Sequence, residues 1–388
     1  MRPSKKTVLT ISLALLLGVA SALMLNYTNR TIEMPSASIF ISLNERVSIR
    51  KTFDIYLRLT VVRNGQIIDV WEDYKDPILK NFYAIVYNYF LGGRAAGYLM
   101  QYKDVSGASQ TYVDTEYGTA GYRSYIGMAI GNGTTPVSPT DYKLASWYKS
   151  ALGVDEVLSE NGTHIWVNYT AQFYIDTNVN ISEAGLFLYH VDTNMYSGVS
   201  LTSVYITRDL ISPPVQLQPD DYLVVTYIVY MKKSGNFVKN FYIFLLNYMF
   251  RNETYSMLSY NDTSGNSHTY VDTEYGGYNP RANIQLGNGT VSFDFTAHNL
   301  SSPIAMESAN VRYEDHTPDN ITVCISALFS FSQDYNISEV GLILGVDADS
   351  SSSQSLVDVL ILYMLPASPI SVTAGQQLIF KITITLTY

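Results

Sequence analysis

The sequence predicts a mainly β fold of two tandem β-sandwich modules, jelly-roll-like, each with one short helix, behind an N-terminal signal or anchor helix. The first observation is an internal duplication, because the octapeptide T-Y-V-D-T-E-Y-G occurs at Thr111–Gly118 and again at Thr269–Gly276. The second is composition: 33 Tyr against 15 Phe, beside many Thr and Val, favours strands. The third is the alternation of short apolar runs with Gly, Asn, Pro and Asp turns.

The duplication extends through most of the chain. Gly131-Asn-Gly-Thr returns at Gly287 and Ile181-Ser-Glu returns at Ile337, with one offset (287 − 131 = 337 − 181 = 156). A repeat of this length has the size of a common domain. We therefore expect two similar modules with few internal gaps.

The chain of 388 residues is divided accordingly. Residues 1–25 are a signal peptide or N-terminal membrane anchor, and residues 26–53 are an N-terminal extension with an extra strand. Residues 54–230 are β-sandwich module one and residues 222–388 are β-sandwich module two. The strand 222–231 is expected to belong to both modules, which leaves no linker between them.

One type of strand is expected three times, at Ile55–Val62, Tyr222–Met231 and Leu378–Tyr388. The first of these is followed by Arg63-Asn-Gly, which predicts a turn. A further strand, Ala37–Leu43, precedes module one and has no counterpart in module two. The other expected strands are Tyr125–Ile130, Ile165–Ile175, Glu183–His190, Val204–Thr207, Ala282–Leu286, Ile321–Phe331, Glu339–Val346 and Val357–Leu365.

Each module's first strand is followed by an expected helix. In module one, Asp76-Pro77 supplies an N-cap and a proline at the first helical position. Phe82 and Val86 then follow at helical spacing, and the second helix is expected to begin near Ser234. Packing of this apolar stripe into the core is the preferred interpretation, and an amphipathic membrane helix is the alternative.

The N-terminal segment has the layout of a secretory signal. Positive charges precede the apolar run Val8–Val19, and Ala20-Ser-Ala22 is a cleavage signature, with the cut after Ala22. If the segment is retained, the apolar stretch through Leu25 is an anchor instead. Either way the body is expected to be extracellular, on a cell surface or on a virion, and to meet a membrane only through this segment.

Charge and sequons both bear on the partners. The net charge is −10, and removal of Arg2, Lys5 and Lys6 leaves −13 (−10 − 3), which argues against nucleic acid and anionic lipid. Twelve Asn-x-Ser/Thr sequons indicate a glycosylated surface, although a Thr-rich β protein also generates them incidentally. Apart from Asn26 and Asn29, the glycosylation candidates are Asn132, Asn161, Asn168, Asn180, Asn252, Asn261, Asn288, Asn299, Asn320 and Asn336.

The octapeptide carries the single metal hypothesis. In a strand, Asp114 and Glu116 point to the same side, as do Asp272 and Glu274, because the side-chain period is two. Such carboxylates can join loop oxygens around Ca²⁺. The alternative is a solvated strand edge whose charges discourage edge pairing. No other cofactor is indicated.

No catalytic arrangement recurs in both modules. Ile181-Ser-Glu is not part of a Gly-x-Ser-x-Gly elbow, and the five histidines do not recur at matching positions. Gly131-Asn-Gly-Thr is expected to be a tight turn in which Asn-Gly supplies a positive φ. The single cysteine, Cys324, is expected to be a buried thiol. We therefore predict that the protein is not an enzyme.

Three segments resemble a known module. They are I-G-N-G-T-T-P-V-S-P-T-D-Y-K-L (Ile130–Leu144), F-Y-I-D-T-N-V-N-I-S-E-A-G-L-F (Phe173–Phe187) and P-P-V-Q-L-Q-P-D-D-Y-L-V-V-T-Y (Pro213–Tyr227). This order resembles the surface structural modules of tail fibres and virions of tailed phages and archaeal viruses. In module two, Gly289-Thr-Val-Ser replaces the Thr-Thr-Pro part. The secretory leader departs from the tail-fibre pattern and favours a membrane-associated virus or an archaeal surface filament.

These features predict a non-enzymatic, exported structural or adhesive protein, a component of a virion or of an archaeal surface filament. We expect it to associate with itself or with other structural subunits by strand addition, with Ala37–Leu43 adding to an open edge near the next subunit's C-terminal module. The first alternative is a monomeric adhesin that binds a host glycan or receptor. The second is a surface glycoside-active enzyme, which needs carboxylates facing each other roughly 5 to 10 Å apart across a cleft.

Overall fold

A computed structural model describes most of the chain. Its described residues are 40–48, 53–73, 78–90, 100–111, 116–117, 122–123, 125–152, 154–193, 200–233, 236–249, 258–269, 281–317, 320–348 and 355–387. They belong to one compact unit, Phe40–Tyr388. Strands make up 60% of the structure and two helices are described, which confirms the predicted mainly β, sandwich-type fold.

The first repeat follows one N-terminal strand. That strand is β1 (Phe40–Ser48), and the helix of the first repeat is α2 (Lys80–Phe90). The strands of the first repeat are β2 (Phe53–Arg63), β3 (Gln66–Asp73), β4 (Tyr102–Lys103), β5 (Ser109–Gln110), β6 (Glu116–Tyr117), β7 (Tyr122–Arg123), β8 (Tyr125–Gly131), β9 (Trp147–Ala151), β10 (Asp155–Glu160), β11 (His164–Tyr174), β12 (Val179–Asp192), β13 (Leu201–Leu217) and β14 (Tyr222–Lys232).

The second repeat begins with α3 (Lys239–Met249), directly after β14. Its strands are β15 (Tyr260–Asn261), β16 (Ser267–His268), β17 (Arg281–Gly287), β18 (Pro303–Ser308), β19 (Asn310–Thr317), β20 (Asn320–Ser330), β21 (Tyr335–Ile337), β22 (Glu339–Asp347), β23 (Leu356–Met364), β24 (Ile370–Val372) and β25 (Gln377–Thr387).

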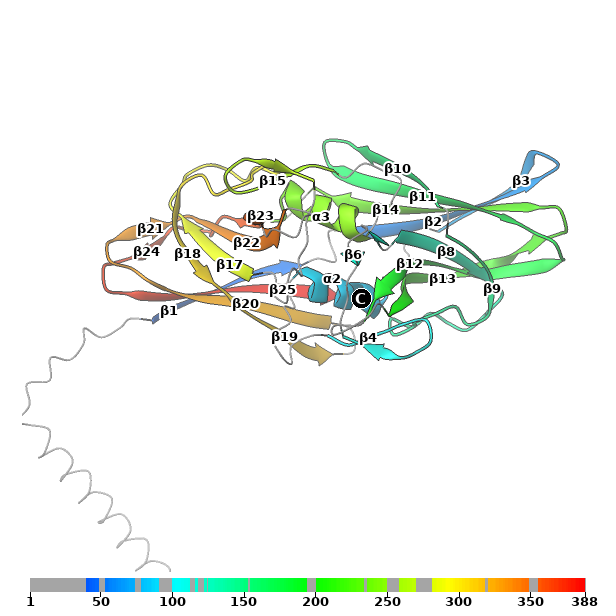
Figure 1. Ribbon diagram of the computed structural model, residues 1–388, viewed down its shortest axis with the longest axis horizontal. Helices are drawn as coiled ribbons and strands as arrows, with labels where there is room; N and C mark the ends of the chain where they lie inside the picture. Colours follow the sequence, from blue (N-terminus) through cyan, green and yellow to red (C-terminus); the bar gives the residue numbers. More distant parts are fainter. Residues whose placement is uncertain are drawn as a thin grey trace, which may run out of the picture. The chain divides into compact units, whose positions relative to one another are not determined.

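Each repeat contributes two main sheets (Figure 1). In the first repeat their orders are β10-β11-β14-β2-β3 and β13-β12-β8-β9. In the second they are β19-β20-β25-β1 and β23-β22-β17-β18. The strands of the two sets correspond, with two exceptions. Among the described strands, the second set has no counterpart of β3, and β1 pairs with β25 in parallel whereas its counterpart β2 pairs with β14 antiparallel.

Alternation along the strands sorts side chains between core and surface. On β14, Leu223, Val225 and Tyr227 are fully buried while the residues between them are half-buried. Leu59 of β2 and Val167 of β11 lie on the same inward face, and these residues belong to one apolar core that also includes strands of the second repeat. This period-two pattern is the one that the sequence displays. The expected strands agree with the observed bounds to within five residues, except that Val204–Thr207 covers only part of β13, which extends to Leu217.

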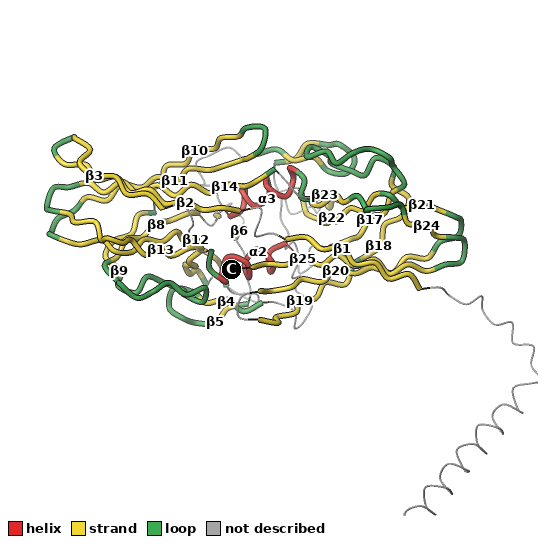
Figure 2. The backbone as a smooth tube through the Cα atoms, turned by 180° about the vertical axis from the view of Figure 1, so that it is seen from behind, coloured by secondary structure: helices red, strands yellow, loops and turns green. Residues whose placement is uncertain are grey.

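Both helices are packed inside the protein, and their starts differ from the prediction (Figure 2). Asp76 and Pro77 lie outside the described residues, but α2 begins only at Lys80, and α3 begins five residues after Ser234. The reason is that the preceding residues extend into bridges with a sheet, Ile78 with Thr207 and Phe237 with Leu362. The preferred interpretation of a core-packed helix is confirmed by the burial of its side chains.

An asparagine near the start of each helix bonds the helix to the backbone beside it. The side chain of Asn81 donates to the carbonyl of Lys103 and accepts from its N–H, at 2.9 and 3.0 Å. Asn240 makes the equivalent pair with Asn261 in the second repeat. Backbone groups on the unpaired edge of a two-stranded sheet need such partners, so the asparagine of the repeated Asn-Phe-Tyr sequence is explained by its role in the fold.

The remaining local predictions have mixed outcomes. Asn64 and Gly65 join β2 to β3 with φ of 51° and 74°, as expected for an Asn-Gly hairpin turn. Cys324 is a buried free thiol on β20. Within the described ranges, no helix is long and apolar enough to cross a bilayer. Residues 1–25, including the cleavage candidate after Ala22, lie outside those ranges.

Candidate assembly interface and the repeated motifs

Glu183, from the Ile181-Ser-Glu motif, is a buried carboxylate that holds a loop in place. Its oxygens accept hydrogen bonds from the backbone N–H groups of Gly133, Ala145 and Ser146 at 3.0, 2.9 and 2.6 Å. The hydroxyl of Ser182 donates to the carbonyl of Gly133 at 2.7 Å. The Ser-Glu pair therefore binds the Gly-Asn-Gly segment from two sides, and its oxygens are taken up by donors of the chain itself.

The second repeat rebuilds this arrangement around Glu339. Its oxygens accept from the backbone N–H groups of Gly289 and Ser302, both at 3.1 Å, and from the Ser301 hydroxyl at 2.5 Å. The hydroxyl of Ser338 again donates to the carbonyl of Gly289. Both halves of the duplicated motif thus have one role, a fully buried carboxylate clamp.

The two clamps differ in the partner that faces the carboxylate. Glu183 accepts from the guanidinium of Arg208 at 2.9 Å, and Arg208 also pairs with Asp141 at 2.6 Å. At the equivalent position of the second repeat, the hydroxyl of Tyr363 donates to Glu339 at 2.6 Å. Burial alone would raise the pKa of Glu339, but hydrogen bonds from Ser301, Tyr363 and backbone N–H groups lower it below its usual value.

The glycines of Gly-Asn-Gly serve a different purpose from the one expected. We expected a tight turn with positive φ, and this is wrong: among the described residues, positive φ does not occur at Gly133 or Gly289. A Cβ added at Gly133 would lie 2.3 Å from an oxygen of Glu183, and one at Gly289 would lie 2.5 Å from an oxygen of Glu339. Glycine is required here because the buried carboxylate approaches the backbone closely.

A second repeated feature, a loop held by the carboxylate of an aspartate, was not predicted from the sequence. In the loop between β4 and β5, Asp104 accepts from the N–H groups of Ser106 and Ala108 at 2.9 and 3.1 Å. Asp262 does the same in the second repeat, with His268 2.9 Å away. Burial opposes ionisation of Asp262, but His268, Asn266 and backbone N–H groups lower its pKa to about 2. The shared Asp-x-Ser-Gly spelling just before the octapeptide was the available signal.

The metal hypothesis lies largely outside the described residues. Asp114, Asp272 and Glu274 are not described, and Glu116 is described only by its backbone, in β6. Across the described part of the chain, no group of three or more His, Cys, Asp or Glu is placed to hold a metal ion. The Ca²⁺ site stays a prediction.

Most of the described sequons are accessible. Asn168 and Asn299 are half-buried, Asn252 is not described, and Asn320 is described only by its backbone. The exposed sequon asparagines are Asn132, Asn161, Asn180, Asn261, Asn288 and Asn336.

The extra N-terminal strand lies at the edge of the second repeat. The pairing of β1 with β25 is parallel and runs from Phe40 opposite Gln377 to Ser48 opposite Thr385. Within the described residues, β25 is the single hydrogen-bonded neighbour of β1, whose other edge carries no strand. Figure 1 shows the two strands side by side. The predicted strand is therefore present, shifted toward the C-terminus relative to Ala37–Leu43, and it is held by one neighbour.

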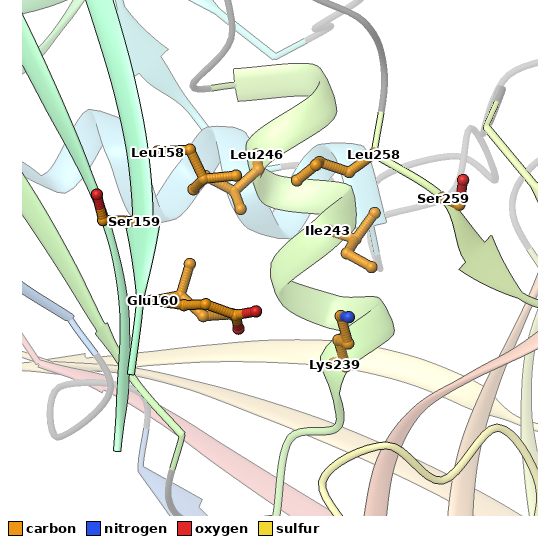
Figure 3. A pocket seen from close by; sticks show the side chains of 9 residues that line it. Leu158, Ser159, Glu160, Lys239, Ile243, Leu246, Leu258 and Ser259 are labelled. Atoms are coloured by element: carbon orange, nitrogen blue, oxygen red, sulfur yellow. The ribbon is translucent and has the colours of Figure 1, made fainter. Parts of the chain in front are cut away.

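A pocket of about 460 Å³ lies between α3 and the hairpin β10–β11 (Figure 3). Its polar groups include Glu160, which pairs with Lys233 at 2.7 Å, and this bond lowers the pKa of Glu160. The pocket is lined by Leu158, Ser159, Glu160, Ile165, Lys239, Ile243, Leu246, Leu258 and Ser259. Its wall is mostly apolar, and nothing in its chemistry selects one ligand.

Aromatic rings gather on the outward face of the five-stranded sheet. Tyr230 of β14 stacks on Trp166 of β11, with ring centroids 5.7 Å apart, and meets Tyr56 edge-on at 5.0 Å. His164 completes this group, and all four residues are half-buried rather than enclosed. We call these four residues the outer aromatic cluster. Rings that remain partly open on a sheet face can stack on a ligand.

Comparison with known proteins does not extend these findings. No protein-family model, curated protein or solved structure matches this chain.

Substitution of Gly133 by alanine tests the carboxylate clamp. Gly133→Ala should lower the free energy of unfolding by about 1–3 kcal/mol, because the new methyl group overlaps Glu183. Gly162→Ala is the matched control: its Cβ meets nothing within 4 Å, so a change within about 0.5 kcal/mol is expected. Denaturant unfolding measures both, and equal effects of the two substitutions would contradict the clamp.

Acid should weaken the clamp of the second repeat. Because the folded pKa of Glu339 lies below its unfolded value of about 4.3, its contribution is present above that pH and is lost as pH falls through the folded pKa. Glu339→Gln should be less stable at pH 7 and show a shallower loss of stability below roughly pH 5. Denaturant unfolding at a series of pH values provides the test, and parallel curves for the two proteins would refute it.

Proposed function

We propose that this chain is a non-enzymatic, exported structural protein of a virion or an archaeal surface filament, whose subunits associate by strand addition. The observation that carries the proposal is the position of β1, an N-terminal strand held by β25 alone among the described strands. Edge strands present unpaired N–H and C=O groups, which are the natural joining points between β subunits.

The duplicated residues support a structural role. Glu183 and Glu339 are fully buried and bind backbone N–H groups, and Asn81 and Asn240 fasten the helices. A carboxylate enclosed in this way is occupied by internal donors rather than directed at a substrate. What the two repeats have in common is therefore the means of building a rigid module twice.

Export is supported by the surface. Exposed sequon asparagines such as Asn132 and Asn288 stand at equivalent places in the two repeats. The predicted secretory leader directly precedes the N-terminal extension, and the net charge of −10 argues against nucleic acid as a partner. The partners in this proposal are further copies or other structural subunits.

Removal of part of β1 tests the proposal. Deleting Pro35–Leu43 removes the first four residues of β1, so the protein should fold but no longer assemble. Deleting Asn26–Met34, a segment of equal length, leaves β1 intact and should assemble as the full chain does. Circular dichroism reports folding, and light scattering with electron microscopy reports assembly. Normal assembly by the first deletion variant would exclude strand addition through β1.

A second candidate, a monomeric adhesin for a glycan or receptor, is favoured by the outer aromatic cluster. In that case Trp166→Ala should reduce retention on a panel of immobilised neutral oligosaccharides by about ten-fold or more, as for an aromatic hot spot. Trp147→Ala, which alters an exposed Trp on β9, is the matched control. Equal retention of both variants and the parent protein would remove this candidate.

A further inference from the structure

We infer that the edge of β25 is an acceptor position that the duplication left open, and that β1 is an exchangeable strand which fills it within one copy and, on assembly, in a neighbouring copy. This inference rests on the proposed function and names its interface. The partner is a second copy of this chain, and the ligand of the acceptor position is a nine-residue strand.

The two repeats have equivalent first and last strands. A long strand opens each repeat before the helix, and another strand comes last. In the first repeat the opening strand is β2, which is followed by β3 before the helix, and the last strand is β14, which lies beside β2 in one sheet. In the second repeat the strand that precedes the helix is β14 and the last strand is β25. By equivalence, β14 would belong beside β25.

Both edges of β14 are already paired within the first repeat. It pairs with β11 along eleven residues on one edge, and with β2 on the other edge. A strand has two hydrogen-bonding edges, so β14 has none left for β25. Among the described strands, the second repeat therefore has none of its own to place beside β25, and β1 takes that position.

The edge of β25 has to be covered by another strand. The side chains of β25 alternate, and Leu378, Phe380, Ile382 and Ile384 are buried in the core. An open edge next to such a strand is a template for pairing with another chain. Coverage by β1 blocks this template, so the single copy is closed by its own N-terminal strand.

The strand β1 can be exchanged between copies of the chain, because its pairing with β25 is the same in either case. Four residues, 49–52, join it to β2, which lies in a sheet of the first repeat. The register of β1 on β25 can be the same whether β1 belongs to the same copy or to another, so the hydrogen bonds gained equal those lost. The balance is then set by local concentration, which a surface or membrane raises. A donor and a separate acceptor in each copy allow an open-ended row of subunits, provided that the rotation between neighbours does not close a ring.

Engineered cysteines distinguish the two pairings. Ser42 and Ile379 are register partners, and Ile379 is half-buried on the outward face of β25. In a Cys324→Ser background, copies with Ser42→Cys are mixed with longer, tagged copies that carry Ile379→Cys, and the mixture is oxidised during assembly. Each copy carries only one of the two cysteines. A mixed disulfide therefore requires β1 of one copy to pair with β25 of another.

The expected result is a mixed disulfide that disappears when Val224→Cys, at the centre of the other sheet, replaces Ile379→Cys. The double variant Ser42→Cys with Ile379→Cys should oxidise within one copy and then lose assembly. If it oxidises in this way but the mixture gives no mixed disulfide, the exchange is wrong. Assemblies without that disulfide would overturn the exchange alone, whereas absence of any assembly by the full chain would also overturn the proposed function.

A peptide experiment covers the case in which the cysteine variants do not fold. An excess of the peptide Phe40–Ser48 should abolish assembly of the unmodified chain, because it competes for β25. A peptide of the same composition in scrambled order should have no effect. Assembly that proceeds unchanged in excess peptide overturns the inference.

Discussion

Both hydrogen-bonding edges of β14 are used within the first repeat, and much of the architecture follows from that commitment. A strand at the centre of a five-stranded sheet cannot serve a second sheet, so the second repeat has to complete its own sheet with a strand from elsewhere. The N-terminal strand β1 meets this need, and it runs parallel to β25 where its counterpart is antiparallel. The duplication has therefore preserved the modules while changing the source of one strand.

The buried carboxylates show how the remaining architecture was preserved. Glu183 and Glu339 hold corresponding loops with the same backbone donors, yet one faces the cation Arg208 and the other the neutral hydroxyl of Tyr363. An ionised group in the core is tolerated when its hydrogen bonds are satisfied, and either partner completes the set. The geometry of the loop is thus more constrained than the identity of the residue that faces the carboxylate.

Prediction from the sequence succeeded where the pattern was local. Period-two alternation located the strands such as β14, and the spelling of Asn64-Gly65 located its turn. Prediction failed where a residue distant in the sequence determines the local structure. The start of α2 depends on the bridge of Ile78 with Thr207, and the need for glycine at position 133 depends on Glu183. The extra strand was predictable, but its pairing with β25 of the same chain was not, because register between distant strands leaves no local trace.

The use of β14 within the first repeat also bears on how many repeats such a chain can contain. The large sheet of the first repeat contains two of the three related strands, β2 and β14, whereas the large sheet of the second repeat contains β25 alone of the three. A single repeat would be complete and would leave β1 without a place. With two repeats, the large sheet of the second repeat lacks one strand, and β1 supplies it. A third repeat would lack a strand in the same way, and the edge of its last strand would stay uncovered. With two repeats, a single N-terminal strand is enough to complete both large sheets.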